Sequence, residues 1–430
     1  MKKKKLILIQ LNEINFDIFK NKLEKFKNLS KILKFKNTTT YSETDYELLE
    51  PWIQWVSVYT GKSASDHRIF RLGDYDYSNE QIYEFLEKNN LKVGAISPMN
   101  AFNKLKKPSY FFPDPWAKIL PKGDDFNKPL FKTISKLVNN NANNKISPSS
   151  AIILLFYLVY YAKLNNFLLY IKILFKILIG KKWNKALFLD LFLSDIHIKN
   201  LKKYNPDFSS VFLNAGAHIQ HHYFLNMIGK SKLNPEWYIQ NKNDPSEDLF
   251  IVYDKIVEDH LKLDQNFDFI IMTALTQTPT NQPTFYYRLK NHQKFLKKFN
   301  IKFKEILPRM TRDFTINFEN KEEAKECENV LNKFIDKDKE KLFGVIDNRG
   351  FSLFVSFTYS KEIKKESKFF FENIEVNIFD DLVFVAIKNG IHNHEGYLFA
   401  SNSISVNKDP FHVKETYNLI KDYFFTREVH

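Results

Sequence analysis

The sequence predicts an α/β fold with a doubly wound, mostly parallel sheet. The first indication is a set of four short apolar runs, at residues 6–11, 92–96, 210–213 and 267–272, typical of central strands covered on both faces. The second is that helical patterns separate these runs, because strands that alternate with helices form parallel sheets. A chain of 430 residues that is 44% hydrophobic also has ample material for a large core.

The other main elements follow from the same patterns, taken in chain order. A charged stretch at 16–34 predicts a helix after the first strand, and a second helix at 81–88 precedes the second strand. A helix at 254–263 leads into the fourth strand. Further along, an apolar run at 382–387 predicts another core strand, and a helix is expected at 413–425.

Two regions interrupt the alternation, so the main α/β domain, residues 1–430, is expected to carry two inserts. The first, at 145–200, is helical, and its apolar part at 151–180 is broken by lysines and asparagines. Its longest uninterrupted run, 151–162, is far shorter than the roughly 20 residues that span a bilayer. We expect a helical hairpin that caps the body. The alternative is peripheral membrane contact through 151–180.

The second insert, at 310–379, has the pattern of a small α+β unit. Residues Asp347 to Gly350 have the composition of a hairpin turn. We expect a strand, a helix and two further strands, at 313–318, 321–334, 342–345 and 351–358.

The net charge and the cysteine content limit the binding partners and the cellular compartment that we expect for this protein. The net charge of +14 comes mostly from lysine, and we interpret it as solvated lysines, although a positive field also attracts phosphate-bearing ligands or an anionic membrane. No zinc-finger, RNA-recognition or homeodomain pattern accompanies the charge, so no specific nucleic-acid partner is expected. Cys327 is the single cysteine, which excludes an internal disulfide and fits a reducing, cytoplasmic location.

Histidines cluster directly after the third predicted strand, at His218, His221 and His222, four to eight residues beyond Asn214. Loops at the carboxyl ends of parallel strands are where α/β proteins build their sites, and neutral imidazole is a common metal ligand. Polar loop histidines bonded to neighbours are the alternative interpretation. The clustering favours a site, above all for His218.

A second group, His392, His394 and Glu395, lies between Gly390 and Gly396 after the strand at 382–387. In an extended segment, two histidines two residues apart point the same way, and the flanking glycines allow sharp backbone turns. Two histidine groups at strand ends suggest that they converge on one centre.

Two further candidate regions lie earlier in the chain. Asn12 and Glu13 follow the first strand, where a carboxylate could ligate a metal or act as a base. A residue at a helix N-terminus, favoured by the helix dipole, is an equally good interpretation. An aromatic stretch from Glu50 to His67 contains Ser57 and is more typical of a core.

These four places, in this order, resemble the type I phosphodiesterase/nucleotide pyrophosphatase branch of the alkaline phosphatase superfamily. The resemblance covers most of the chain outside the inserts and implies an alkaline-phosphatase-like α/β fold. The family has an Asp-Gly pair after its first strand, matched here by Asn12-Glu13, and a Thr-Gly turn with a following His, matched by Thr60-Gly61 and His67. Its Asp-x-x-x-His pair is matched by Asn214 and His218, and its late His before a Gly by His392 and Gly396.

The sequence also departs from the family pattern. The family's Thr or Ser nucleophile precedes the turn threonine by nine residues, and that position is Pro51, which has no nucleophilic atom. Glu50 and Ser57 are the nearest substitutes. A late Ser-Asp-His-Gly segment is replaced by Thr273 to Gln277, which removes two metal ligands. The resemblance therefore implies one metal site at most and argues against a two-metal hydrolysis.

The resemblance also implies roles for the residues that match it or stand near the matches. One divalent metal, zinc or manganese, is expected on Asn214, His218 and His392. Glu13, His221 and His394 are the candidate catalytic groups. Substrate-binding roles are expected for Asn12, Glu50, Ser57, His67, His222 and Glu395.

The expected function is that of a divergent enzyme acting on a phosphoester or a nucleotide-linked sugar, by hydrolysis or transfer, as in surface polysaccharide synthesis. Its partner would be a phosphate-bearing small molecule or a glycan. The missing nucleophile favours an alternative, a catalytically inactive family member that acts as a binding or membrane-associated assembly protein. The density of polar residues around His221 and His394 favours the enzyme.

Overall fold

The computed structural model describes residues 4–117, 119–139, 147–238, 243–263, 267–309, 312–406 and 410–426. The chain divides into two compact units. Unit 1 comprises Met1–Lys136, Ile146–Thr280 and Gly390–His430, and unit 2 comprises Leu137–Lys145 and Asn281–Asn389.

An eight-stranded sheet forms the centre of unit 1. In chain order its strands are β1 (Leu6–Leu11), β2 (Lys36–Tyr41), β3 (Val93–Ile96), β4 (Tyr110–Phe112), β5 (Phe208–Leu213), β6 (Asp268–Met272), β16 (Glu395–Ala400) and β17 (Phe411–His412). They are arranged in the order β17-β2-β16-β6-β1-β5-β3-β4. The strands from β6 to β4 are parallel, and β16 is antiparallel to its two neighbours. The mostly parallel sheet expected from the sequence is therefore confirmed.

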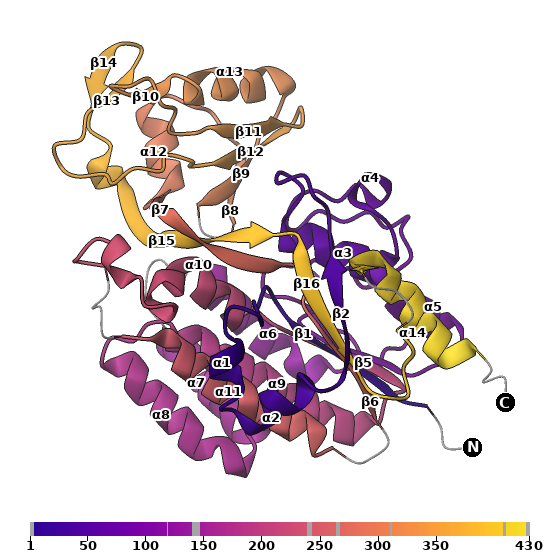
Figure 1. The fold of residues 1–430 in the computed structure, drawn as a ribbon. Helices are drawn as coiled ribbons and strands as arrows, with labels where there is room; N and C mark the ends of the chain where they lie inside the picture. The colour runs from indigo at the N-terminus through magenta and orange to yellow at the C-terminus, as the bar shows by residue number, and fades with distance from the viewer. Residues whose placement is uncertain are drawn as a thin grey trace. The chain divides into compact units, whose positions relative to one another are not determined.

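Helices cover both faces of this sheet (Figure 1). Side chains alternate along a strand, and Leu6 and Leu8 of β1 share a buried cluster with one helical layer. On the opposite face, Ser209 of β5 hydrogen-bonds His197 of the other layer. The first layer contains α3 (Pro51–Thr60), α5 (Ile82–Lys88) and α14 (Thr416–Phe425), and the second contains α9 (Asn184–Tyr204), α10 (Ala215–Met227) and α11 (Pro245–Leu261).

The helical insert expected at 145–200 forms three helices. Two of them, α7 (Pro148–Tyr161) and α8 (Phe167–Leu178), are joined by a 3₁₀ turn at Leu164–Asn166, and both pack on the third, α9. Since α9 itself contacts β3 and β5, it belongs to the layer that covers the sheet. The remaining helices of unit 1 are α1 (Lys20–Leu23), α2 (Lys27–Ile32), α4 (Ala64–His67) and α6 (Lys128–Asn139).

Unit 2 has its own aromatic-rich core, in which Phe295, Phe334 and Phe343 are buried. It holds a four-stranded sheet of order β11-β12-β9-β8 and a three-stranded sheet of order β10-β13-β14. Its elements are α12 (His292–Lys298), β8 (Glu305–Pro308), β9 (Asp313–Asn317), α13 (Lys321–Leu331), β10 (Phe334–Asp336), β11 (Val345–Asn348), β12 (Ser352–Ser356), β13 (Phe369–Phe371) and β14 (Ile374–Val376).

Unit 2 begins earlier in the sequence than the insert expected at 310–379. A pair of long strands, β7 (Thr276–Leu289) and β15 (Leu382–Asn393), carries the chain out of unit 1 and back into it. β7 escapes a sequence-based prediction because Pro279 and Pro283 interrupt a polar segment, and proline is rare inside strands. The apolar run at 382–387 is a strand, the first half of β15, but the expected core strand is wrong, because in the described part of the chain β15 pairs only with β7 in a two-stranded sheet and is only partly buried.

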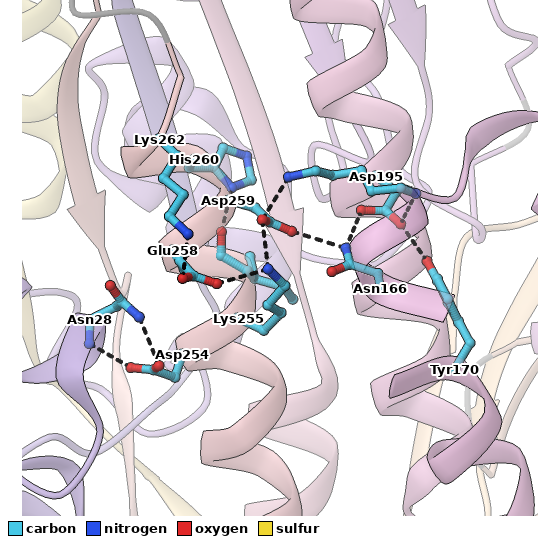
Figure 2. Close-up of polar contacts among 12 residues, drawn as sticks. Asn28, Asn166, Tyr170, Asp195, Asp254, Lys255, Glu258, Asp259, His260 and Lys262 are labelled. Carbon is cyan, nitrogen blue, oxygen red and sulfur yellow. Dashed lines mark hydrogen bonds and ion pairs between the residues drawn. The ribbon is translucent and has the colours of Figure 1, made fainter. Parts of the chain in front are cut away.

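The single helix expected at 16–34 is wrong, because the chain forms two short helices, α1 and α2, with a break at Phe26. The break has a tertiary cause. Asp254 of α11 accepts a hydrogen bond from the backbone N–H of Asn28 at 2.7 Å (Figure 2). It accepts a second one from the N–H of Leu29 at 2.9 Å. A carboxylate in this position caps a helix, so α2 starts at Lys27 instead of continuing α1.

The strand expected at 342–345 is also displaced, because β11 starts only at Val345. Leu342 and Phe343 are instead completely buried in the core of unit 2. The turn before β12 starts at Arg349, since Asn348 still pairs with Leu353. Burial of the two apolar side chains therefore takes precedence over the strand pattern.

Candidate functional site

The candidate site lies at the edge of the sheet where β1, β5 and β6 end. Leu11 of β1 pairs with Leu213 of β5, and Gln10 pairs with Met272 of β6, so the three strands end level with one another. Because β16 is antiparallel to β6, the segment that precedes β16 reaches the same edge. Residues that are distant in the sequence meet here, as expected at the carboxyl ends of parallel strands.

Three side chains converge at this edge, and we call them the Glu13–His221–His392 cluster. Oε2 of Glu13 lies 3.1 Å from Nε2 of His221 and 3.3 Å from Nε2 of His392. The two imidazole nitrogens are 3.2 Å apart. Glu13 and His392 are buried, and His221 is partly buried. Among the residues that the structure describes, these are the metal-ligating side chains that the fold gathers in a group of three.

The spacing of the three atoms fits a single divalent cation. Bonds of 2.0–2.1 Å in a tetrahedral arrangement place ligand atoms about 3.3 Å from one another, close to the distances of 3.1–3.3 Å in the cluster. Three protein ligands of mixed nitrogen and oxygen type are typical of open, catalytic zinc sites. Manganese also accepts carboxylate ligands. One carboxylate and two imidazoles could therefore hold a metal and leave a coordination position for a ligand.

The backbone at Glu13 is held in an unusual conformation. Its φ angle is +61°, in the left-handed region that few residues other than glycine adopt. Glu13 also forms an isolated parallel bridge with Thr276, and its carbonyl oxygen accepts a hydrogen bond from Nε2 of Gln220 at 2.6 Å. Such a conformation costs about 1 kcal/mol or more and persists where the surroundings fix it. It turns the side chain toward the cluster directly after β1, and no helix starts at Glu13.

Two amides hold the carboxylate of Glu13. Nδ2 of Asn12 donates to Oε1 at 2.9 Å, and Nε2 of Gln277 donates to Oε2. Burial raises the pKa of Glu13, but the neighbouring charges of His392 and His221 lower it more, so the net pKa lies well below its ordinary value. Glu13 is therefore an ionised carboxylate in a buried setting.

The orientation of His221 presents its Nε2 atom to the cluster. Nδ1 lies 3.2 Å from the carbonyl oxygen of Gly390, and since a carbonyl can only accept, Nδ1 carries the proton. Such a bond fixes the tautomer of a metal-ligating histidine. A side chain at position 390 would disturb this contact, because a Cβ atom there would lie 2.3 Å from Oε1 of Gln277 and 2.6 Å from the carbonyl oxygen of Gln220.

A chain of amides links the two strands that support the cluster. Nδ2 of Asn12 also donates to Oδ1 of Asn214 at 2.8 Å, and Nε1 of Trp55 donates to Oδ1 of Asn12 at 2.7 Å. The carboxylate of Asp190 accepts from the backbone N–H groups of Asn214 and Ala215. Asn12 and Asn214 therefore lie beside Glu13 and join β1 to the start of α10.

The histidines after β5 lie on a helix, not on the loop that the sequence predicts, because α10 begins at Ala215. His218 and His222, four residues apart, share one face, and their ring centroids are 4.9 Å apart. Burial, and then the charge of His221, lowers the pKa of His218 to about 4. Only His221 points into the cluster, so the expected ligand set of Asn214, His218 and His392 shares only His392 with the group that the structure brings together.

Some of the other residues expected at the site lie near it. Glu50 precedes α3, and its Oε2 lies 3.6 Å from Nδ1 of His392, an electrostatic contact beyond hydrogen-bonding distance. His394 connects β15 to β16, and Glu395 is the first residue of β16. The carbonyl oxygens of His394 and Glu395 accept hydrogen bonds from Ser42 and Thr276, respectively. Their roles in catalysis and substrate binding remain predictions.

Ser57 and His67 are completely buried and bond to each other. Nδ1 of His67 accepts from the N–H of Ile69 at 3.1 Å, so its Nε2 carries the proton and donates to Ser57 Oγ at 3.2 Å. Burial lowers the pKa of His67 to about 4. Pro51 is the first residue of α3. The structure thus places these residues in the packing of α3 and α4.

Sequence reasoning missed three side chains that position the cluster: Trp55, Gln220 and Gln277. Gln220 stands between His218 and His221, and Gln277 ends the segment that replaces the family's Asp and His ligands. For Gln220, the available signal was an amide beside a histidine group. For Gln277, it was an amide in place of a lost metal ligand. Trp55 gave no signal, because it lies in an aromatic stretch whose composition is that of a core.

No known protein-family model matches this chain, and no curated protein matches it in sequence. Among solved structures, it is similar to phosphonoacetate hydrolase from Sinorhizobium meliloti, with a TM-score of 0.46 and 11% identity over 98% of this chain and 96% of that one.

The chain is also similar to two further solved structures. Murine ectonucleotide pyrophosphatase/phosphodiesterase 5 gives a TM-score of 0.44 at 12% identity, over 99% of this chain and 96% of that one. Alkaline phosphatase from the Antarctic bacterium TAB5 gives 0.40 at 11% identity, over 98% of each chain.

Proposed function

We propose that the Glu13–His221–His392 cluster binds one divalent cation, zinc or manganese, and that the chain acts there on a phosphoester or a nucleotide-linked sugar. The observation that carries the proposal is the convergence of three ligand atoms, from segments more than 150 residues apart, to within 3.1–3.3 Å. Positive charge on His392 and His221 keeps the buried carboxylate of Glu13 ionised, and metal binding would replace the two imidazole protons that carry this charge. A divalent cation would supply that charge, and it would attract phosphate oxygens and stabilise the charge that develops on them.

The surrounding residues would prepare the three ligands. Gly390 fixes the tautomer of His221 through its carbonyl oxygen, and Glu50 lies beside the outer nitrogen of His392. Hydrogen bonds from Asn12 and Gln277 hold both oxygens of Glu13. Contacts of this kind orient ligands and raise their basicity.

The proposed reaction uses no covalent enzyme intermediate on a hydroxyl. The position of the family's nucleophile is Pro51, and Ser57 is buried and bonded to His67. The hydroxyl of Thr276 donates to the carbonyl of Glu395, and that of Thr273 accepts from the N–H of Tyr397. The oxygen of an acceptor, either water or a sugar hydroxyl, would therefore attack phosphorus directly. A new P–O bond would form as the bond from phosphorus to the leaving oxygen breaks, and the proton lost by the attacking oxygen would be balanced by protonation of the leaving group from water. We predict that this reaction is a cytoplasmic step in surface polysaccharide synthesis.

Metal analysis tests this proposal. The full-length protein should contain about one equivalent of zinc or manganese after purification or titration, and Glu13→Gln and His392→Ala should lose it. His412→Asn is the matched control, because it removes an imidazole outside the cluster and keeps an acceptor at the cap that His412 Nδ1 provides for Lys414. Metal contents that are equal in all four proteins, or absent from wild type, would contradict the proposed site.

A second candidate function, a binding protein without turnover, is favoured by the missing nucleophile at Pro51. Activity of the metal-loaded protein on nucleotide sugars and on bis-p-nitrophenyl phosphate separates the two. Turnover that His392→Ala abolishes supports the enzyme. Metal-dependent binding of a nucleotide sugar without product formation supports the binding protein.

A further inference from the structure

The α7–α8 segment, residues 147–180, exposes an unusually large apolar surface. Of the 25 large apolar side chains that are exposed in the described part of the chain, 12 lie between Ile152 and Ile179. Leu164, Leu168 and Leu178 are 85%, 73% and 83% exposed. Monomeric proteins rarely expose contiguous apolar surface of this extent, and such patches mark interaction sites.

The exposed residues occupy one side of each helix. On α7 they are Ile152, Leu155, Phe156, Val159 and Tyr160, and on α8 and the turn before it they are Leu164, Leu168, Ile171, Leu174, Phe175, Leu178 and Ile179. The buried residues, such as Tyr161 on α7 and Tyr170 on α8, contact aromatic side chains of α9. Both helices therefore turn an apolar face away from α9.

A buried polar network fixes this orientation at the turn between the two helices (Figure 2). Nδ2 of Asn166 donates to Asp195 on α9 at 2.8 Å and to Asp259 on α11 at 2.9 Å. The hydroxyl of Tyr170 donates to Asp195 at 3.0 Å, and Lys163 forms an ion pair with Asp259 at 2.6 Å. Since the polar groups all bond inward, the segment cannot rotate to bury its apolar face without breaking them.

The charged side chains of the α7–α8 segment are all positive. No Asp or Glu occurs between Asp125 and Asp190, whereas lysine occurs six times from 163 to 185. Lys163 and Lys176 pair with carboxylates of α11. For Lys172, Lys181 and Lys182 the structure shows no ion pair within the described residues. An apolar face flanked by lysines matches an anionic lipid surface.

The helices are too short to cross a bilayer. α7 has 14 residues and α8 has 12, which at 1.5 Å per residue gives about 21 and 18 Å, against about 30 Å of hydrocarbon. Within the residues described, no helix meets the length and hydropathy needed for a span. A segment of this kind would lie in the plane of the interface.

We infer that the α7–α8 segment docks this protein on the surface of an anionic lipid bilayer, with the apolar faces of both helices in the headgroup region and Lys172, Lys181 and Lys182 at the phosphates. A second copy of the chain fits the surface less well, because two such faces would bring lysines together with no acidic partner in the segment. The inference is independent of the metal cluster and of any reaction there.

Vesicle flotation with the full-length protein tests the inference. We expect the protein to float with vesicles that contain 30% phosphatidylglycerol and to remain unbound with pure phosphatidylcholine. The variant Leu168→Ser/Leu178→Ser should reduce binding more than tenfold, as should Lys172→Glu/Lys181→Glu/Lys182→Glu. Phe351→Ser/Ile374→Ser is the matched control, because it removes two exposed apolar side chains of unit 2 and should bind as wild type does.

A depth measurement gives a second, independent result. Cys327 is buried, so a nitroxide label on Leu168→Cys reacts at a single exposed site, and its accessibility to oxygen should rise relative to a polar relaxation agent when anionic vesicles are added. Equal binding by wild type and the serine variant, or an unchanged label, would overturn the inference. A dimer in light scattering that the same serine substitutions dissociate would also overturn it, in favour of a second copy.

Discussion

At the scale of single residues, the unusual feature is a carboxylate that the fold holds under strain. Glu13 combines a left-handed backbone with complete burial, and amides of Asn12, Gln220 and Gln277 hold its side chain and backbone. Residues held in sparsely populated backbone regions cluster at functional sites because the surrounding structure fixes them there. The amides around Glu13 are therefore as informative as the histidines that face it.

The contact between Gln277 and Glu13 gives a prediction for metal affinity. Gln277→Leu removes the donor to Oε2 of Glu13, so the carboxylate is less well oriented, and we expect zinc or manganese to bind about 10- to 100-fold more weakly. Calorimetric titration measures this change. Gln293→Leu, at an exposed position of unit 2, is the control. Unchanged affinity in Gln277→Leu would show that this amide does not orient the ligand.

At the scale of elements, the start of α10 depends on a buried carboxylate of α9. Asp190 accepts from the N–H groups of Asn214 and Ala215 and from the hydroxyl of Tyr253. Burial raises its pKa to about 7, although these three donors lower it. Asp190 thus sets where the helix that carries His221 begins.

Removal of this carboxylate should destabilise the protein substantially. In Asp190→Ala two buried donors and the part-buried N–H of Asn214 lose their acceptor. Each buried unsatisfied group costs about 1–3 kcal/mol, so we expect a loss of at least about 2 kcal/mol in the free energy of unfolding by urea. Asp45→Ala removes a turn carboxylate that, within the described residues, accepts only from the N–H of Glu47 at the surface, and it should cost under about 1 kcal/mol. Equal effects of the two variants would exclude the capping role.

A buried histidine pair joins α9, α11 and β5. Nδ1 of His260 donates to the carbonyl of Ile256, so its Nε2 accepts from Nδ1 of His197, whose own Nε2 faces the hydroxyl of Ser209. Burial lowers the pKa of His260 to about 4 and that of His197 well below its ordinary value. Both rings are therefore neutral in the folded protein.

The depressed pKa of His260 predicts a pH-dependent contribution to stability. A histidine that ionises less readily when folded stabilises the protein above its unfolded pKa of about 6.5, and this contribution is lost as the pH falls toward about 4. The advantage of wild type over His260→Gln should shrink by about 3 kcal/mol between pH 7.5 and pH 4. Urea unfolding at several pH values measures this difference, in which the titrating groups that do not interact with His260 cancel. A constant difference would contradict the pairing.

At the scale of the whole molecule, the chain contains two compact units with separate cores. The core of unit 2 is formed by residues between Tyr287 and Leu382, all from one continuous segment. Unit 1 is assembled from three segments, and the last of these, Gly390–His430, supplies His392. Completion of the candidate site therefore requires the chain to return from unit 2.

The continuity of the core of unit 2 predicts that residues 281–389 fold alone. A fragment of residues 281–389 contains the whole of that core, and a segment of about 110 residues is a usual size for an independent domain. We expect cooperative thermal unfolding and a near-UV circular dichroism signal. A fragment that lacks both would show that unit 2 needs the rest of the chain.

The sequence by itself determined the four parallel strands β1, β3, β5 and β6 at the centre of the sheet, and the positions where polar residues gather; it did not predict β2, β4, β16 or β17. Strands such as β1 and β5 are apolar on both faces, a local pattern that does not depend on what packs against them. Glu13, His221 and His392 were all recognised as candidates, because each follows or ends a predicted strand. Helical inserts were recognisable by the same local patterns.

Only the tertiary structure decided which of these candidates meet. A helix that starts at Ala215 sends His218 and His222 to one face and His221 toward Gly390, and the left-handed backbone of Glu13 aims its carboxylate at that ring. The physical reason is that helix starts and backbone strain are fixed by distant groups, Asp190 and Gln220 among them. Interactions between residues so far apart in sequence leave no local pattern to recognise.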